Sequence, residues 1–238
     1  MAKIKVLGSG SKGNSYILED NSGNMLLLEL GIGWKEILKG IKYFLPKVCG
    51  CLVTHSHQDH SKSIDKALNY GLEVYSCQDV VEKHKGVILL QEEHKYKIGD
   101  FYVQPIHVEH NVENYAYLID HKDFGRMLFY TDCVYFPYNI KDVNHIIGEV
   151  NYSEDVAIDK LCDGIDIRSH NEYHMELEDA LDTLKRLNND NLRTIMCIHL
   201  SDGQSDEKMF EKRIHDDMGI KPYIATKGLE VELLNEDF

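Results

Sequence analysis

The sequence predicts an α/β fold in which two mixed β-sheets pack together and helices cover their outer surfaces. Short apolar segments typical of strands come in runs rather than in strict alternation with helices, which favours two mixed sheets over one parallel sheet. Segments with helical periodicity lie between and after those runs. The chain has 238 residues, 43% of them hydrophobic, and a chain of this length buries a sizeable core. We therefore expect one domain spanning residues 1–238.

The predicted strands are short segments in which apolar residues dominate or alternate with polar ones. In chain order they cover residues 4–7, 16–18, 25–30, 48–54, 73–76, 101–108, 115–119, 127–131, 146–150, 194–198, 221–225 and 229–233. The predicted helices cover residues 34–43, 61–69, 78–83, 153–161, 177–187 and 206–218. Residues 177–187 are the clearest helix, because leucine or alanine recurs there at the spacing of one helix face.

Composition excludes several classes of protein. The 40 acidic residues outnumber the 26 basic ones and give a net charge of −14, so the chain lacks the bulk basic field that attracts nucleic acid phosphates. A polyanionic substrate would need a local patch or a bound metal. No apolar run approaches the length of a membrane span, and the first residues lack the apolar core of a signal peptide. We expect a cytoplasmic protein without a membrane partner.

Cysteine usage indicates the same compartment. The six cysteines are Cys49, Cys51, Cys77, Cys133, Cys162 and Cys197. None belongs to a Cys-x-x-Cys pair, and we expect reduced thiols.

A glycine-rich segment near the start matches a dinucleotide-binding pattern in sequence but not in context. Residues 8–13 read Gly-Ser-Gly-Ser-Lys-Gly after a predicted strand. In dinucleotide-binding folds this pattern opens a helix, whereas residues 14–18 continue as a strand. We therefore interpret the segment as a hairpin turn. If the turn borders an active site, its backbone N–H groups could bind an anion.

The strongest functional signal is a cluster of titratable residues directly after the predicted strand 48–54. His55, His57, Asp59 and His60 lie within six residues of sequence. Imidazole and carboxylate are good ligands for borderline divalent metals, and burying so many titratable groups without a metal would be costly. A chance cluster on an exposed loop is the alternative, and it does not explain this density.

Further ligands are expected where other apolar strands end, because α/β folds place their chemistry there. The candidates are His110, Asp132 and His199, which follow the predicted strands 101–108, 127–131 and 194–198 in that order.

These residues resemble the metal motifs of the metallo-β-lactamase superfamily. The segment His55-Ser56-His57-Gln58-Asp59-His60 is similar to the family's H-x-H-x-D-H motif, and the three later candidates are similar to its later His, Asp and His. The resemblance implies an αββα sandwich with the metal site along one edge. It also implies one ion held by His55, His57 and His110, a second ion held by Asp59, His60 and His199, and a bridging Asp132.

Within this superfamily the chain resembles the small nuclease-like members of the YycJ/WalJ type. The similar segments are residues 7–15, 29–32, 149–152 and 174–178. Two positions depart from that pattern, because Glu29 stands where Asp is usual and Tyr152 stands where a His is expected.

The predicted activity is hydrolysis of a phosphodiester with two divalent metal ions. Two ions about 3.5–4 Å apart suit in-line attack at phosphorus. The ligands are nitrogen and oxygen without thiolate, so we expect Zn²⁺ first and Mn²⁺ second. Asp59 is expected to orient the attacking water, and His174 to protonate the leaving group. His170 is a second candidate acid, and an exposed position at a helix start is the alternative for His174.

The substrate stays open between nucleic acid ends and a small nucleotide, cyclic signalling nucleotides included. The resemblance favours a DNA exonuclease, whereas the net charge of −14 fits a small nucleotide at least as well. Alternatives on the same fold are a thioester, lactone or lactam hydrolase and a redox di-iron protein, whose branch normally has Glu at the position of His57. A metal-binding module without catalysis is disfavoured because every ligand position is filled. The sequence leaves the oligomeric state open, a homodimer included.

The remaining histidines and several tyrosines receive structural interpretations. We expect His107 to pack beside the metal site. The histidines expected at the surface are His84, His94, His121, His145 and His215. Core positions are expected for Tyr115, Tyr117, Tyr130, Tyr135 and Tyr138. One or two of these tyrosines could instead stack on a base.

Overall fold

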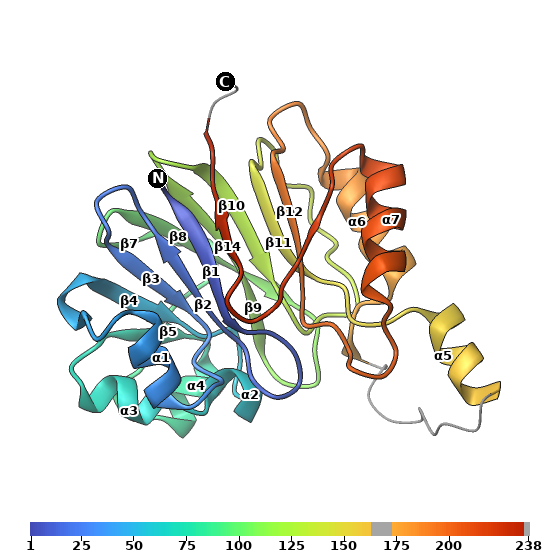
Figure 1. Ribbon diagram of the computed structural model, residues 1–238. Coiled ribbons are helices and arrows are strands. Elements are labelled where there is room, and N and C mark those ends of the chain that lie inside the picture. Colours follow the sequence, from blue (N-terminus) through green and yellow to red (C-terminus); the bar gives the residue numbers. More distant parts are fainter. Residues whose placement is uncertain (163–172, 236–238) are drawn as a thin grey trace.

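The computed structural model describes residues 1–162 and 173–235. Within these residues two seven-stranded sheets pack against each other, and helices lie outside them (Figure 1). The predicted architecture of two mixed sheets flanked by helices is therefore confirmed.

Each sheet has an antiparallel half and a parallel half. The first sheet has the order β14 (Glu230–Glu232), β1 (Lys3–Gly8), β2 (Ser15–Glu19), β3 (Met25–Leu28), β4 (Val48–Leu52), β5 (Val74–Ser76) and β6 (Ile88–Leu89). The second sheet has the order β13 (Tyr223–Ile224), β12 (Thr194–Ile198), β11 (His145–Glu149), β10 (Gly125–Tyr130), β9 (Asn114–His121), β8 (Phe101–Val108) and β7 (Tyr96–Ile98). Pairing is parallel from β3 to β6 and from β10 to β13, and antiparallel elsewhere.

The helices divide between the two sheets. Those beside the first sheet are α1 (Trp34–Gly40), α2 (Gln58–Ser61), α3 (Ile64–Asn69) and α4 (Gln78–Lys83), and those beside the second are α6 (Leu177–Leu187) and α7 (Glu207–Met218) (Figure 1). A further helix, α5 (Glu154–Cys162), precedes α6, and a short 3-10 helix covers Leu45–Lys47. The apolar face predicted for residues 177–187 is buried against the second sheet. The carboxylate of Asp206 caps α7 by accepting the Met209 N–H, as helix N-termini require.

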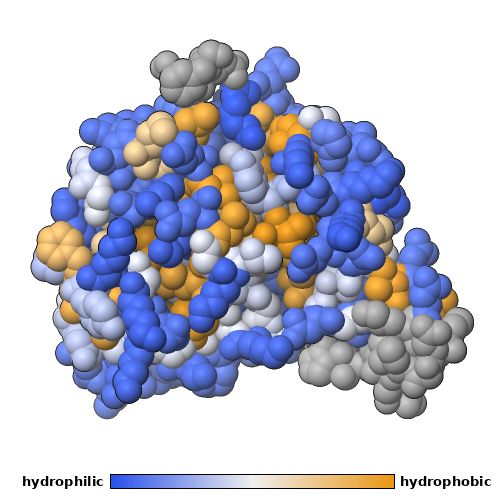
Figure 2. Space-filling view, in the orientation of Figure 1, coloured by the Kyte–Doolittle hydropathy of each residue, from blue (hydrophilic) through white to orange (hydrophobic). Residues whose placement is uncertain are grey.

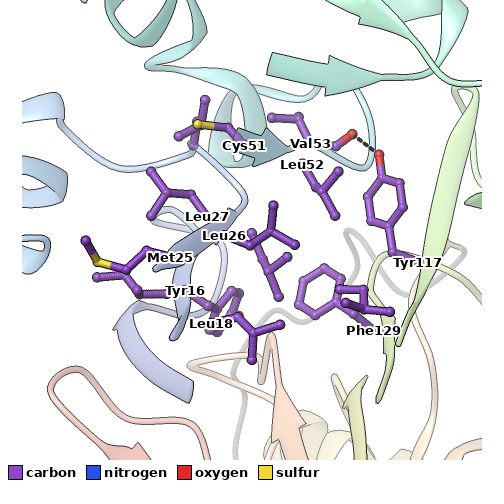
Figure 3. Close-up of a cluster of buried hydrophobic side chains, with 14 of the residues drawn as sticks. Tyr16, Leu18, Met25, Leu26, Leu27, Cys51, Leu52, Val53, Tyr117 and Phe129 are labelled. Atoms are coloured by element: carbon purple, nitrogen blue, oxygen red, sulfur yellow. Dashed lines mark hydrogen bonds between the residues drawn. The ribbon is translucent and has the colours of Figure 1, made fainter. Parts of the chain in front are cut away.

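The interior between the sheets is apolar. Leu18 and Leu26 from the first sheet and Phe129 from the second are fully buried there (Figure 3). The Tyr117 hydroxyl, on the second sheet, donates to the Val53 carbonyl at 2.6 Å. This hydrogen bond joins the two sheets close to the metal motif, which begins at His55.

The glycine-rich segment is a hairpin turn, as predicted. It connects β1 and β2, which pair antiparallel, and no helix opens after it. Gly13 has a φ of 138°, a conformation that glycine adopts without steric cost. The dinucleotide-binding alternative is thereby excluded.

Several predicted boundaries are wrong. The helix predicted over residues 34–43 ends at Gly40, and Lys42 and Tyr43 have positive φ angles of 53° and 59°, which a right-handed helix excludes. The helix predicted over residues 61–69 begins only at Ile64, because the Ser63 N–H donates to the Leu30 carbonyl at 2.9 Å. The strands β6 and β7 were not predicted.

The surface in Figure 2 is hydrophilic over most of the face shown, with strips of hydrophobic side chains between polar ones. Among residues 1–162 and 173–235, no helix combines the length and apolar character needed to cross a membrane. The cysteines with described side chains are free thiols, and the side chain of Cys162 lies outside this set.

Candidate metal centre

All the predicted ligands lie at one edge of the sandwich, where strands from both sheets end. His55, His57, Asp59 and His60 follow β4, whereas His110, Asp132 and His199 follow β8, β10 and β12 in that order. The strands β10 and β12 run parallel through β11, and β8 runs in the same direction because it pairs antiparallel with β9, as β10 does. Their carboxyl ends therefore meet at this edge.

One group of potential ligands contains His55, His57, His110 and Asp132, each with a ligand atom within 4.8 Å of the others. His110 Nε2 lies 3.3 Å from His57 Nδ1. Asp132 Oδ2 lies 3.7 Å from His55 Nε2 and 3.8 Å from His110 Nε2. Ligand atoms around tetrahedral zinc, with bonds of about 2.0–2.1 Å, lie about 3.3 Å apart. The observed separations are close to that spacing.

The second group contains Asp59, His60, Asp132 and His199, again within 4.8 Å of one another. His60 Nε2 lies 3.3 Å from Asp59 Oδ2 and 3.3 Å from Asp132 Oδ1. His199 Nε2 also lies 3.3 Å from Asp59 Oδ2. Asp132 thus faces the first group with Oδ2 and the second with Oδ1. The two groups are adjacent and share one carboxylate.

The first group fits a divalent metal through its neutral, unsatisfied imidazoles. Burial lowers the pKa of His55 and His57 and lowers that of His110 to about 4, and the neutral ring is the form that binds metal. His55 Nε2 is buried and has no hydrogen-bond partner among the described residues. An orphaned buried nitrogen is costly, and a bond to a metal would relieve that cost.

The second group fits a cation because it contains two carboxylates, those of Asp59 and Asp132. Burial disfavours charged imidazoles here too, but Asp132 and the neighbouring carboxylates outweigh it. They raise the pKa of His60 well above its usual value and that of His199 to about 10. The carboxylates therefore stabilise positive charge at this position, and a divalent ion would supply it.

Solved structures of low sequence identity have the same fold. The metallo-β-lactamase fold protein YhfI from Bacillus subtilis aligns with a TM-score of 0.77 and 18% identity, over 98% of this chain and 100% of that one. Zn²⁺-bound PqqB from Methylobacterium extorquens aligns with a TM-score of 0.73 and 12% identity, over 97% and 100%. The chain has the metallo-β-lactamase fold.

Curated relatives of this chain include two exonucleases of the type that the sequence resembles. Exodeoxyribonuclease WalJ from Streptococcus pneumoniae is 28% identical over 140 residues, which cover 51% of this chain and 52% of that protein. Exodeoxyribonuclease YycJ from Bacillus anthracis is 28% identical over 167 residues, or 63% and 62% of the two chains. The chain thus spans between about half and three-fifths of the length of these relatives. No family model matches it.

Three of the non-glycine residues with positive φ angles lie at the candidate metal centre. Glu29, Asp132 and His199 have positive φ angles of 65°, 51° and 56°, a conformation that costs a non-glycine residue about 1–3 kcal/mol. Asp132 and His199 are candidate ligands, and the Glu29 carboxylate lies 3.5 Å from His60 Nδ1. Such strain persists where the surrounding structure holds functional groups in place.

Glu149 is a site residue that the sequence analysis did not identify. It ends β11 and is fully buried, with Oε1 2.6 Å from His174 Nδ1 and 3.1 Å from His199 Nδ1. Its Oε2 accepts the Cys133 N–H at 3.1 Å. Burial raises the pKa of Glu149, but the bonds from His174 and His199 outweigh this and lower it. Its sequence signal is a position at the end of an apolar strand, similar to that of Asp132, and a solvated acid can also occupy such a position.

A cavity of about 360 Å³ opens over both ligand groups. His174 lines it, and its ring stacks on His199 with centroids 5.2 Å apart. The glycine-rich turn borders the cavity through Ser11. Uncharged polar side chains complete the lining, namely Asn111, Asn151, Tyr173, Ser201 and Gln204. His170, the second candidate acid, lies outside the described residues.

Three predictions about the burial of histidines are wrong. His107 is exposed rather than packed, because its side chain points away from the core on an alternating strand. His121 and His145 are buried rather than exposed, and aromatic rings contact both. Tyr115, Tyr117 and Tyr130 are in the core as expected, but Tyr135 and Tyr138 are exposed.

Proposed function

We propose that the chain is a metal-dependent hydrolase that cleaves phosphodiester bonds at nucleic acid ends or in nucleotides. The observation that carries the proposal is the pair of ligand groups that share Asp132 at the floor of a polar cavity. Two adjacent divalent ions suit in-line displacement at phosphorus. The similarity to proteins named exodeoxyribonucleases supports the same class of substrate.

The ligand set favours Zn²⁺, with Mn²⁺ as the second choice, because it combines imidazole and carboxylate without thiolate. In this proposal His55, His57 and His110 hold one ion, Asp59, His60 and His199 hold the other, and Asp132 contacts both. Bound ions of this kind supply Lewis acidity that activates water and neutralises charge on the phosphoryl oxygens.

In this proposal Asp59 orients the attacking water and His174 protonates the leaving group. The Asp59 side chain is 25% exposed and lines the cavity, so it can also accept a hydrogen bond from water. His174 Nδ1–H donates to Glu149, which leaves Nε2 for the leaving oxygen of the substrate. Burial lowers the pKa of His174, but the bond to Glu149 outweighs it and raises this pKa. A protonated His174 is the form that a general acid needs.

A small nucleotide, including a cyclic signalling nucleotide, is the second candidate substrate. Besides the potential metal ligands and His174, the described residues that line the cavity are uncharged. Long nucleic acids gain affinity through many phosphate contacts with Lys and Arg, and the net charge of −14 opposes such contacts.

Assays of metal-loaded protein test the proposal. Wild-type protein should hold about two Zn²⁺ or Mn²⁺ ions per chain and hydrolyse bis(p-nitrophenyl) phosphate. Single-stranded DNA, RNA and cyclic nucleotides then rank the natural substrates. Asp132→Ala should lose nearly all activity, because it removes a ligand from both groups. Hydrolysis of thioesters or lactones without any phosphodiester would contradict the proposal while leaving the metal centre intact.

The same assays separate the role of His174 from that of the ligands. His174→Ala should keep its metals and lose about 10²–10⁴-fold in rate on a dinucleotide, whose alkoxide leaving group needs a proton. p-Nitrophenolate needs little protonation, so bis(p-nitrophenyl) phosphate should be nearly spared. His94→Ala, at an exposed position, is the control. An equal slowing of both substrates by His174→Ala would rule out the general-acid role.

A further inference from the structure

A second cavity, of about 540 Å³, lies beside the metal centre on the same edge of the second sheet. We call it the tyrosine groove, and it is lined by His107, Val108, Glu109, Val134, Tyr135, Pro137 and Tyr138. Val134, Tyr135 and Tyr138 expose 37%, 37% and 39% of their surface. Two exposed aromatic rings in a concave apolar site are unusual on a protein surface without a binding role.

The tyrosine groove and the metal centre are adjacent along two loops. Glu109 directly precedes the candidate ligand His110, and Val134 follows the candidate ligand Asp132 by two residues. Consecutive Cα atoms are about 3.8 Å apart, so the backbone of the groove begins within about 8 Å of both ligands. This spacing is short enough for a substrate held at the candidate ligands to extend one further chemical unit to the groove residues.

The loop that carries the tyrosines is held in place from behind. Phe136 is fully buried and stacks on Tyr130 with centroids 5.3 Å apart. The Arg186 guanidinium donates to the carbonyls of Phe136 and Tyr138 at 2.6 and 3.2 Å, and it lies over the Tyr135 ring at 4.9 Å. The two exposed rings are thus presented on a fixed backbone, which lowers the entropic cost of binding.

The charge of the groove determines what it can accept. Glu109 contributes the one carboxylate among the groove residues. A phosphate would be repelled there, whereas a nucleobase is flat, apolar on its faces and uncharged. Bases stack on aromatic rings irrespective of sequence, and their amino groups donate hydrogen bonds to carboxylates. The groove therefore fits a base better than a phosphate.

We propose that the tyrosine groove binds a nucleobase of the nucleotide next to the phosphodiester held at the metal centre, with Tyr135 and Tyr138 as the stacking surface. This inference rests on the proposed function and narrows it, because it requires a substrate with at least one unpaired base beside the scissile bond. A strand end that is single-stranded meets this requirement.

Kinetics with two substrates test the inference. Tyr138→Ala should raise KM for a short single-stranded oligodeoxynucleotide about tenfold, as expected for the loss of one stacked base. It should leave KM unchanged for the same oligodeoxynucleotide with an abasic site at its end, because that substrate offers no base to stack. Tyr138→Phe should retain the wild-type KM, since the ring is kept. Tyr102→Ala is the matched control, because Tyr102 is 43% exposed and lies at the opposite end of β8 from His107.

Photo-crosslinking locates the base directly. An oligodeoxynucleotide with 5-iodouracil at its end, irradiated on the wild-type protein, should label Tyr135 or Tyr138. Trypsin cuts after Arg126 and Lys141, so both lie in one peptide, residues 127–141. Labelling of another peptide only, or a Tyr138→Ala variant that treats the oligonucleotide like wild type, would overturn the inference. If Tyr138→Ala instead changes the oligomeric state, a second copy occupies the groove and the inference is wrong.

These outcomes are distinguishable from failure of the proposed function. Wild-type protein that hydrolyses bis(p-nitrophenyl) phosphate but gives no label in residues 127–141 keeps the hydrolase proposal and loses the base site. Protein that hydrolyses no phosphodiester loses the hydrolase proposal, whatever the crosslinking shows.

Discussion

Among single residues, His145 couples protonation to folding at a point remote from the metal centre. It begins β11, whereas the candidate ligands follow the opposite ends of the neighbouring strands. Its Nε2–H donates to the Phe124 carbonyl at 2.9 Å. Burial lowers the pKa of His145 to about 4, compared with about 6.5 in an unfolded chain.

This pKa predicts a loss of stability in acid. Because the folded pKa lies below the unfolded one, the unfolded chain binds more protons as the pH falls from 6.5 towards 4. The free energy of unfolding should decrease over that window by roughly 3 kcal/mol from His145 alone. Denaturant titrations at several pH values would show a shallower pH dependence for His145→Gln than for wild type. His215→Gln, at an exposed position, should follow the wild-type curve, and identical slopes for all three proteins would refute the prediction.

Single residues differ in how clearly the sequence indicates their role. The dense His55–His60 motif indicated candidate ligands because three histidines and an aspartate lie within six residues, and the structure brings their side chains into two groups that could hold metal ions. Glu149 was not identified because a single carboxylate at a strand end resembles any solvated acid until His174 and His199 are placed beside it. His145 was assigned to the surface because a lone histidine carries no signal of burial.

At the scale of elements, the metal motif is positioned by close contact between the loops after β3 and β4. The Leu30 N–H donates to the His60 carbonyl at 2.8 Å. A Cβ added at Gly31 would lie 1.6 Å from the Asp59 carbonyl oxygen. Only glycine permits this approach, which carries Asp59 and His60 into the second ligand group.

Gly31→Ala should therefore push the motif out of place. Overpacking of this kind costs about 1–3 kcal/mol and sometimes more, and the displaced loop should bind less metal. Denaturant unfolding and elemental analysis of the variant would measure both effects. Gly33→Ala is the control, since no atom lies within 4 Å of its added Cβ and its φ of −61° suits any residue. If Gly31→Ala has the same stability and metal content as the wild type, the loop accommodates the added methyl group and the prediction is wrong.

Elements with strong patterns were predicted well, and those without them were not. The leucine face of α6 and the alternation along β8 both follow from a period that burial imposes. By contrast, β6 (Ile88–Leu89) and β7 (Tyr96–Ile98) are too short to show an alternation of apolar and polar residues in the sequence. The predicted end of α1 is wrong because Lys42 and Tyr43 adopt positive φ angles. Neither residue type indicates such a backbone conformation in the sequence.

At the scale of the whole molecule, the candidate ligands come from both sheets. His55, His57, Asp59 and His60 follow a strand of the first sheet, and His110, Asp132 and His199 follow strands of the second. Each ligand group contains residues from both sides, so an ion bound in either group would link the sheets. A single domain over residues 1–238, a cytoplasmic location and a homodimer stay predictions.

Metal removal should therefore lower the stability of the entire fold. A ligand that binds only the folded state at about 1,000 times its Kd stabilises it by about 4 kcal/mol. For a domain of 150–250 residues this corresponds to a Tm shift of roughly 8–16 °C. Thermal unfolding of wild-type protein with Zn²⁺ and after chelation would measure the shift. Asp132→Ala, which lacks the shared carboxylate, should show a much smaller one. If chelation removes the metal from wild-type protein and Tm does not fall, the ions do not bind the folded protein in preference to the unfolded chain, and the prediction is wrong.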